Sequence, residues 1–270
     1  MKKRISIFAL AFIFLIVGVA GCIGPVTSAV KDSVYAERGG SLVASYTETV
    51  NYAYKNQTVY MTDPKLPSYN PDGYTCGIVA ASNIIGWYHK QYSGLIPGHV
   101  AGGIVPIIGT WYWTPQNAYI YTLASDLSTA MSETVNGVTM SNYLSGFSSY
   151  VAGKGRTATV TNLMSGGTLN YSSAKTALEA GKIISIFLNG YSLGGILQGT
   201  GVDTLPIEEY AGLHIMAVYG YVEVDYFNAQ NVNFRSDKYF LVHTGFGGLH
   251  GFLMLNSHTT VDGTYITHIS

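Results

Sequence analysis

Cys76 and His214 are the two residues of this chain whose types and surroundings best suit nucleophilic chemistry. A cysteine attacks a carbonyl carbon efficiently when a base stands beside it, and histidine is the usual base. Cys76 follows a run rich in turn-forming residues, 68–73, and begins an apolar stretch that is too long for one strand. The sequence therefore predicts a cysteine at the point where a loop becomes a buried helix.

The start of a helix is a favourable position for a reactive thiol. Thr75 is a suitable N-cap, which would put Cys76 in the first helical turn. Unpaired backbone N–H groups and the helix dipole at that end favour a thiolate over a thiol. The alternative is that Cys76 is a small buried hydrophobic residue, which is the commoner role of a lone cysteine.

Among the seven histidines, His214 is the strongest candidate for the base. It begins an otherwise apolar predicted strand, 213–221, where a buried imidazole needs a polar partner. It could also be a structural core histidine whose hydrogen bonds are satisfied. His89 lies about four turns beyond Cys76 on the same predicted helix, out of its reach. The remaining candidates lie in a predicted loop, after a glycine turn or in a polar tail: His99, His250, His258 and His268.

The elements that would position these residues come in the order helices first, strands second. Apolar residues recur at helical spacing over 116–131 and 139–151, and a further predicted helix, 172–180, is closed by Gly181. Strands are predicted at 157–162, 183–188, 214–224, 238–243 and 251–255, with a further strand within 42–60 and an irregular loop at 94–114. This order indicates an α+β domain with a helical half and a mostly antiparallel sheet half.

The first 22 residues resemble the leader of a bacterial lipoprotein. Basic residues 2–4 precede an apolar run, 5–19, and Val19-Ala20-Gly21-Cys22 resembles a lipobox. The resemblance implies that Cys22 is lipid-modified and that the protein is an extracytoplasmic, membrane-anchored lipoprotein. The alternative is an ordinary secretory leader. In either case Cys22 is acylated or removed, so we expect no disulfide between Cys22 and Cys76.

Composition argues against a nucleic-acid partner. Charged residues make up 11% of the chain and the formal net charge is −1. Loss of the leader would reduce the basic residues from 14 to 11 against 15 acidic ones, so a basic stripe is not expected. The histidines lack a metal-binding HExxH spacing, and we expect neither a metal nor another cofactor. We interpret 23–58 as a tether or lead-in, with a role as a pro-segment left open, and 59–270 as the catalytic domain.

Three short segments of the sequence resemble the papain-like cysteine peptidases. Cys76-Gly77 and the small, apolar helix after it resemble the nucleophile helix, most closely that of the streptopain-like and bacteriocin-leader-processing branches. Gly212-Leu213-His214, followed by Gly220-Tyr221, resembles the histidine strand. Gly245-Phe246-Gly247-Gly248 resembles the Gly-Trp-Gly-Gly turn. The similarity runs from about residue 60 to residue 255, and it implies a nucleophile helix packed on an antiparallel sheet or half-barrel.

The same resemblance implies roles for further residues. Members carry Asn or Asp before the glycine turn to orient the histidine; here the position falls on His243, or on Thr244 if shifted by one, or has no equivalent. An amide upstream of the cysteine helps to bind the oxyanion, and Asn70 stands six residues before Cys76 where Gln is expected. Both assignments depart from the usual pattern.

Three functions follow as alternatives. The first is a peptidase that cleaves polypeptides through Cys76 and His214. The second is a cell-wall peptide amidase or transpeptidase that uses the same pair. The third is a catalytically inactive papain-like binding lipoprotein, which the missing Asn or Asp favours. The nucleophile helix alone also resembles that of the streptococcal immunoglobulin-degrading peptidases, which would alter the substrate but not the mechanism.

Overall fold

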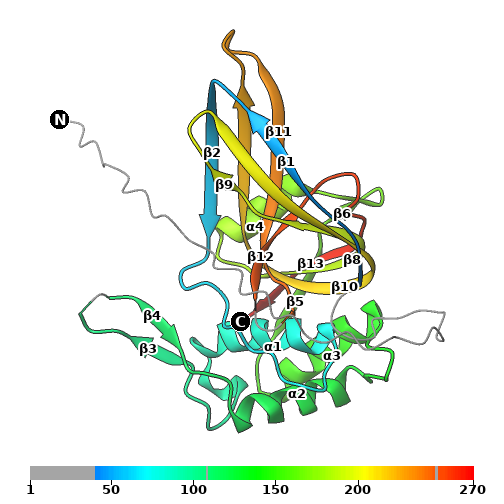
Figure 1. Cartoon of the computed structure of the whole chain (residues 1–270). Helices are drawn as coiled ribbons and strands as arrows, with labels where there is room; N and C mark the ends of the chain where they lie inside the picture. The colour runs from blue at the N-terminus through cyan, green and yellow to red at the C-terminus, as the bar shows by residue number, and fades with distance from the viewer. Residues whose placement is uncertain (1–39, 108, 247–248) are drawn as a thin grey trace, which may run out of the picture. The chain divides into compact units, whose positions relative to one another are not determined.

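The computed structural model describes residues 40–107, 109–246 and 249–270 (Figure 1). The predicted leader, Cys22 and the first part of the predicted tether lie outside these residues, so their interpretation stays a prediction. Within the described part of the chain, none of the helices has the length and apolar character needed to cross a bilayer.

Four α-helices occur among the described residues, and all four were expected from the sequence. They are α1 (Cys76–His89), α2 (Ala118–Ala130), α3 (Met140–Gly153) and α4 (Tyr171–Glu179). Side chains of Asn117, Thr139 and Asn170 cap the last three by accepting a hydrogen bond from a first-turn N–H. Gly181 follows α4 with a φ of +72°, the left-handed conformation that favours glycine after a helix.

The strands form one large antiparallel sheet, which confirms an α+β fold (Figure 1). Its centre is β10 (Val202–Phe227), a 26-residue strand that is far longer than the sequence pattern indicated. β10 pairs with β1 (Ser41–Asn51), β2 (Tyr54–Met61), β8 (Ile184–Gly194), β9 (Leu197–Gln198) and β11 (Asn233–His243). The sheet continues through β12 (His250–Met254), β13 (Val261–Ile269) and β5 (Ala158–Asn162).

The pairing of β10 brings the catalytic candidates to one region. The ladder β10–β11–β12–β8 returns to β10, so these four strands close on themselves. On β10, His214 lies opposite Leu188 of β8, and Ala217, three residues on, lies opposite His243 of β11. His214 and the end of β11 are therefore held next to each other by main-chain hydrogen bonds.

Three predictions about chain organisation are corrected. Residues 41–58 are part of the main sheet, because β1 and β2 both pair with β10, so the proposed boundary at residue 58 cuts through β2. The C-terminal polar tail contains β13, which lies between β8 and β5; its buried threonines hide the strand pattern. The 94–114 loop holds a 3-10 turn, η1 (Ser93–Leu95), and a hairpin of β3 (Gly102–Ile104) and β4 (Trp111–Trp113). A further two-stranded ribbon, β6 (Met164–Ser165) with β7 (Thr168–Leu169), precedes α4.

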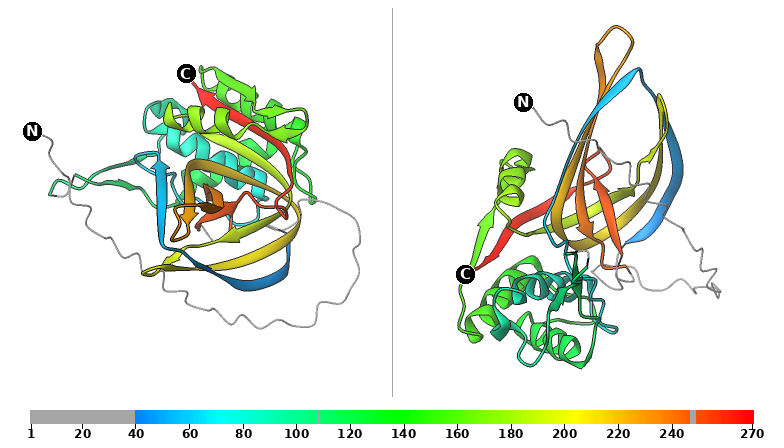
Figure 2. Two further views of the ribbon diagram at one scale, coloured as in Figure 1. Left: turned by 90° about the horizontal axis from the view of Figure 1, so that it is seen from above. Right: turned by 90° about the vertical axis from the view of Figure 1, so that its left-hand side faces the viewer.

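Helix α1 is buried on nearly every side, since only Trp87 among its residues is not fully enclosed. It packs against β10, with α2 and α3 nearby, and the apolar side chains between them form one core cluster. A second cluster lies between the sheet and α4 (Figure 2). Gly77 permits the close fit at the start of α1, because a Cβ there would stand 2.5 Å from Val138 Cγ2 and 3.2 Å from Ile215 Cδ1. That fit brings Cys76 against β10.

Candidate active site

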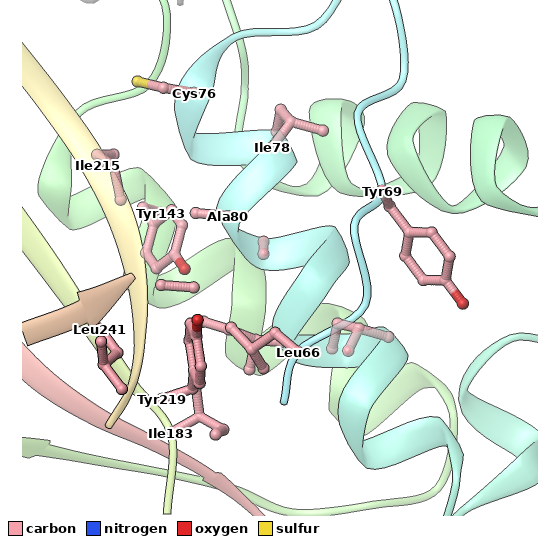
Figure 3. Close-up of a cluster of buried hydrophobic side chains, with 14 of the residues drawn as sticks. Leu66, Tyr69, Cys76, Ile78, Ala80, Tyr143, Ile183, Ile215, Tyr219 and Leu241 are labelled. Atoms are coloured by element: carbon pink, nitrogen blue, oxygen red, sulfur yellow. The ribbon is translucent and has the colours of Figure 1, made fainter. Parts of the chain in front are cut away.

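Cys76 is the first residue of α1, as the sequence predicts, and its side chain is 1% exposed. Figure 3 shows the thiol directed toward the strand that carries Ile215. Burial raises the pKa of the Cys76 thiol to about 11, although the backbone N–H groups of Ile215, Gly77 and Cys76 itself oppose this rise. The helix start therefore acts in the expected direction, but desolvation is the larger effect and the resting group is a neutral thiol.

Thr75 occupies the N-cap with an extended backbone, but its side chain does not cap the helix. Its hydroxyl and its backbone N–H both donate to Oε1 of Glu133, at 2.6 and 2.8 Å. The N–H groups of the first turn of α1 are thus left without a side-chain acceptor from the N-cap. Glu133 also raises the pKa of Cys76 by its negative charge. The sequence analysis missed Glu133, although it and Asp126 are the only charged residues (Asp, Glu, Lys or Arg) between 91 and 153.

His214 is completely buried on β10 and lies between two aromatic rings. The centroids of Tyr191 and Phe246 are 5.3 and 5.1 Å from the imidazole, and both rings are nearly parallel to it. Burial lowers the pKa of His214 to about 4, so the resting imidazole is neutral. The aromatic neighbours explain this value, because they exclude the water that would stabilise an imidazolium.

The hydrogen bonds of His214 fix its tautomer. Its Nε2 lies 2.6 Å from the backbone oxygen of Thr244, and a carbonyl oxygen can only accept, so Nε2 carries the hydrogen. Nδ1 is then the basic nitrogen, and it is buried with no hydrogen-bond partner among the described residues. On this strand, the N–H of Ile215, the residue after His214, lies close enough to the Cys76 thiol to lower its pKa. A direct hydrogen bond between the thiol and Nδ1 is not among those formed by the described residues.

His243 does not hold His214 in the predicted way. Its Nδ1 accepts from the N–H of Gly245 at 3.3 Å and lies 3.5 Å from the amide of Asn83, while its Nε2 is buried without a partner among the described residues. Burial lowers the pKa of His243 to about 3, with further lowering from His250 and His214. Of the two residues suggested by the sequence, His243 and Thr244, it is Thr244 that contacts His214. The contact is made by the main-chain oxygen of Thr244 and not by its side chain.

Asn70 lies before the helix, as expected. Its hydrogen bond to Gln116 links two segments of the chain and does not involve Cys76. Its backbone N–H donates to Oε1 of Gln116 at 2.6 Å, while its own Oδ1 is buried without a partner among the described residues. Among the described residues, Asn70 forms no hydrogen bond with Cys76, so its role in binding the oxyanion stays a prediction.

A groove of ≈ 910 Å³ opens beside the start of α1. Residues 72–75 form one wall and residues 133–135 form the other. Thr75, which directly precedes Cys76 in the chain, lines this groove, whereas Cys76 itself does not. Val135, on the opposite wall, is 91% exposed.

Cys76 is a free thiol. The described part of the chain contains no group of three or more His, Cys, Asp or Glu side chains placed to bind a metal ion. Comparison with protein-family models, curated proteins and solved structures gives no match to this chain.

Proposed function

We propose that this chain is a papain-like cysteine peptidase in which Cys76 is the nucleophile and His214 the base. The observation that carries the proposal is the tautomer of His214: Nε2–H is bound to the Thr244 carbonyl, which leaves Nδ1 basic and unpartnered within the described site. This nitrogen lies on the strand that approaches the Cys76 thiol through Ile215. A general base needs such a free nitrogen beside the group that it deprotonates. Since neighbouring residues of a strand face opposite sides of a sheet, the imidazole of His214 must move toward the Cys76 thiol before it can act.

The reaction begins from a neutral pair, because the pKa of Cys76 is raised to about 11 and that of His214 is lowered to about 4. As the sulfur attacks the peptide carbonyl carbon, the thiol proton moves to Nδ1 and the carbonyl oxygen becomes an oxyanion. The imidazolium then protonates the amine as the C–N bond breaks, which leaves a thioester on Cys76. A water molecule deprotonated by His214 hydrolyses the thioester and restores the thiol.

The Thr244 carbonyl has a defined part in this cycle. The partial negative charge on its oxygen stabilises the imidazolium that forms on His214 and keeps Nδ1 aimed in one direction. A neutral carbonyl is a weaker acceptor than a carboxylate, so it holds the ring while leaving the resting imidazole uncharged.

The start of α1 would bind the oxyanion. The side chain of Thr75 leaves the first-turn N–H groups uncapped, and the N–H of Cys76 is the donor nearest to the bond that forms. Asn70 would supply a second donor from its side-chain amide, after a rotation toward the thiol. A donor of this kind contributes about 3 kcal/mol to the stability of the transition state.

The groove beside Thr75 would hold the polypeptide substrate. Cys76 and His214 are both buried, so a bound peptide must displace some of the side chains that cover them. Phe246 is the nearest partly exposed cover, since its ring lies on the imidazole. We therefore expect the substrate to shift this ring when it binds.

A binding protein without turnover is the second candidate function. The raised thiol pKa and the enclosure of His214 favour it, because a thiol that stays neutral and covered does not react. A cell-wall peptide amidase or transpeptidase would use the same pair and differ only in substrate.

Alkylation of Cys76 separates these functions. The Cys22→Ser chain is treated with iodoacetamide, and the rate of alkylation is measured on the Cys76 peptide. This rate is compared with the rate for glutathione. The measurement is made with and without a denatured protein substrate. Protection of Cys76 by substrate, together with cleavage that is lost in Cys76→Ser and strongly reduced in His214→Gln, supports the peptidase. Release of peptides from peptidoglycan alone supports the amidase, and a correctly folded protein that cleaves neither leaves the binding function.

We also propose that the protein is anchored outside the cytoplasm through a lipid on Cys22. Metabolic labelling with a fatty acid tests this directly. Incorporation into the wild-type chain and its loss in Cys22→Ala is expected, whereas a labelled Cys22→Ala chain, or an unlabelled wild type, contradicts the anchor.

A further inference from the structure

The β3–β4 hairpin carries the most exposed large apolar side chain among the described residues. It extends away from the helices in two different views (Figure 1, Figure 2). Ile107, next to its tip, is 95% exposed, and Ile104 is 60% exposed. Tyr112, on the paired strand, is 53% exposed. Exposed apolar residues that gather on one projecting element mark an interaction surface.

Charge is missing from this whole region of the sequence. From Gln91 to Ser125 there is no Asp, Glu, Lys or Arg, and His99, which is buried, is the one residue with an ionisable basic ring. A projecting hairpin in water normally carries charged side chains that keep it soluble. A hydrocarbon environment imposes the opposite requirement, because a charged side chain is costly there.

The base of the hairpin has a different composition from its tip. Trp111 and Trp113 stand on β4, and their rings meet edge to face at a centroid distance of 5.6 Å. The amino group of Lys90 lies 5.0 Å from the Trp111 ring, and Trp113 Nε1 donates to the backbone oxygen of Lys65. Two tryptophans, one of them beside a lysine ammonium group, with Ile107 beyond them toward the turn, are arranged as at a membrane–water interface.

The hairpin can enter an apolar medium without exposing unpaired main-chain groups across its strands. Gly102 pairs with Trp113 and Ile104 pairs with Trp111. Nearer the turn, the N–H of Val105 donates to Thr110, and the N–H of Gly109 donates to Val105, both at 2.9 Å. The outer edge of each strand has no neighbouring strand, so this pairing is compatible with shallow insertion at the bilayer interface and not with a position in the hydrocarbon centre.

We propose that the β3–β4 hairpin inserts shallowly into a lipid bilayer, with Ile107 among the acyl chains, the Ile104–Trp111 pair at their upper boundary and Trp113 at the headgroups. Insertion to a depth of about 5–10 Å matches the length of its short strands. A lipid surface fits better than a protein partner, because protein interfaces have a polar rim and the chain carries no Asp, Glu, Lys or Arg between Gln91 and Ser125. This inference is independent of the proposed peptidase activity.

Two of the three tryptophans of the chain lie on β4, so tryptophan fluorescence can locate the hairpin. The test uses the full chain with vesicles of phosphatidylcholine and phosphatidylglycerol in which bromine is carried on the upper acyl chain. We expect bromine to quench roughly half of the emission, to fail to quench a Trp111→Phe, Trp113→Phe variant, and to quench Trp87→Phe as strongly as wild type. Since bromine quenches only tryptophans near the acyl chains, binding through the leader or the lipid anchor does not imitate the result.

A charge placed on the hairpin supplies the second arm of the test. Ile104→Asp with Ile107→Asp should abolish the quenching, while Val232→Asp, at the turn between β10 and β11 where Val232 is 55% exposed, should leave it unchanged. Circular dichroism checks that each variant is folded. Vesicle-bound protein without quenching overturns the proposal, as does quenching that survives the double substitution. A dimer in sedimentation velocity that the double substitution separates, without quenching of the wild type, assigns the hairpin to a second copy of the chain and also overturns it.

Discussion

The Nε2–H of His214 donates to the backbone oxygen of Thr244 over 2.6 Å. The acceptor belongs to the main chain at the end of β11, and β11 pairs directly with β10, which carries His214. The orientation of the imidazole is therefore set by strand register, and no side chain at position 243 or 244 is required for it. Side-chain changes at these positions can separate orientation of the base from stability of the fold.

The first prediction concerns His243. Replacement by Ala should leave the rate constant of peptide cleavage within about threefold of wild type, because the Thr244 carbonyl still holds His214. It should lower the free energy of unfolding by about 1–3 kcal/mol, since the acceptor for the Gly245 N–H is lost from a buried position. Urea denaturation and initial rates on one preparation measure both effects.

The matched control is Thr244→Ser, which retains the hydroxyl that donates to Leu249 and accepts from Phe246. It should resemble wild type in both measurements. A fall in kcat of a hundredfold or more in His243→Ala, with stability unchanged, would make His243 the orienting residue and would contradict the role assigned to the Thr244 carbonyl.

The second prediction concerns the ring that covers His214. Phe246→Ala should admit water to one face of the imidazole and move the pKa of His214 upward from about 4, because burial is the main cause of its low value. The Cε1 proton of His214, followed by NMR against pH, reports this change. Phe246→Trp retains an aromatic cover and should keep the pKa low. If Phe246→Ala leaves the titration of His214 unchanged, the low pKa of His214 is caused by Tyr191 and the strand alone.

The third prediction concerns Glu133. Glu133→Gln keeps an oxygen that accepts from Thr75 but removes the negative charge that raises the pKa of Cys76. Alkylation of Cys76 should therefore have its midpoint at a lower pH than in wild type and be severalfold faster near pH 9. Because the acceptor remains, the midpoint of thermal unfolding should change little.

Glu133→Ala removes both the charge and the acceptor, and it should also reduce stability by about 1–3 kcal/mol. If the alkylation profile of Glu133→Gln coincides with that of wild type, the charge of Glu133 does not reach the thiol and this account of its pKa fails.

The helices could be read from the sequence because their apolar spacing is regular and local. Cys76 was placed at its helix start, and the expected N-cap, Thr75, stands there. The hydrogen bond of the Thr75 hydroxyl could not be anticipated, because its acceptor, Glu133, lies 58 residues away along the chain. Long-range polar contacts of this kind leave no periodic signal.

The sheet was predicted less completely, for physical reasons that differ between strands. β10 continues through Pro206 and Gly212, residues that normally interrupt a strand, so only its apolar second half was expected. β13 buries Thr264 and Thr267, which look solvent-exposed in a sequence pattern. The acceptor for His214 is a backbone carbonyl, a group that every residue has, so no residue type could indicate it.

The fourth prediction is that the protein loses stability steeply in mild acid. Burial lowers the pKa of His214 to about 4, of His243 to about 3 and of His250 to about 4, while each would titrate near pH 6.5 in the unfolded chain. Between these values the unfolded state binds protons that the folded state does not, so stability is intact above pH 6.5 and falls as pH drops toward 4. With three such histidines, the free energy of unfolding should fall by about 4 kcal/mol for each pH unit near pH 5.

Urea denaturation at several pH values between 7 and 4.5 measures this slope. His250→Gln removes the most accessible of the three rings, whose Nε2 lies 3.0 Å from the Ser68 hydroxyl, and should reduce the slope by about a third, to roughly 3 kcal/mol per pH unit. Val232→Gln is the control, because it changes an exposed side chain without adding or removing a titratable group, and it should leave the slope unchanged. A stability that stays constant down to pH 5 would mean that the histidines are protonated in the folded protein, and His214 would then be an imidazolium at rest instead of the neutral base proposed above.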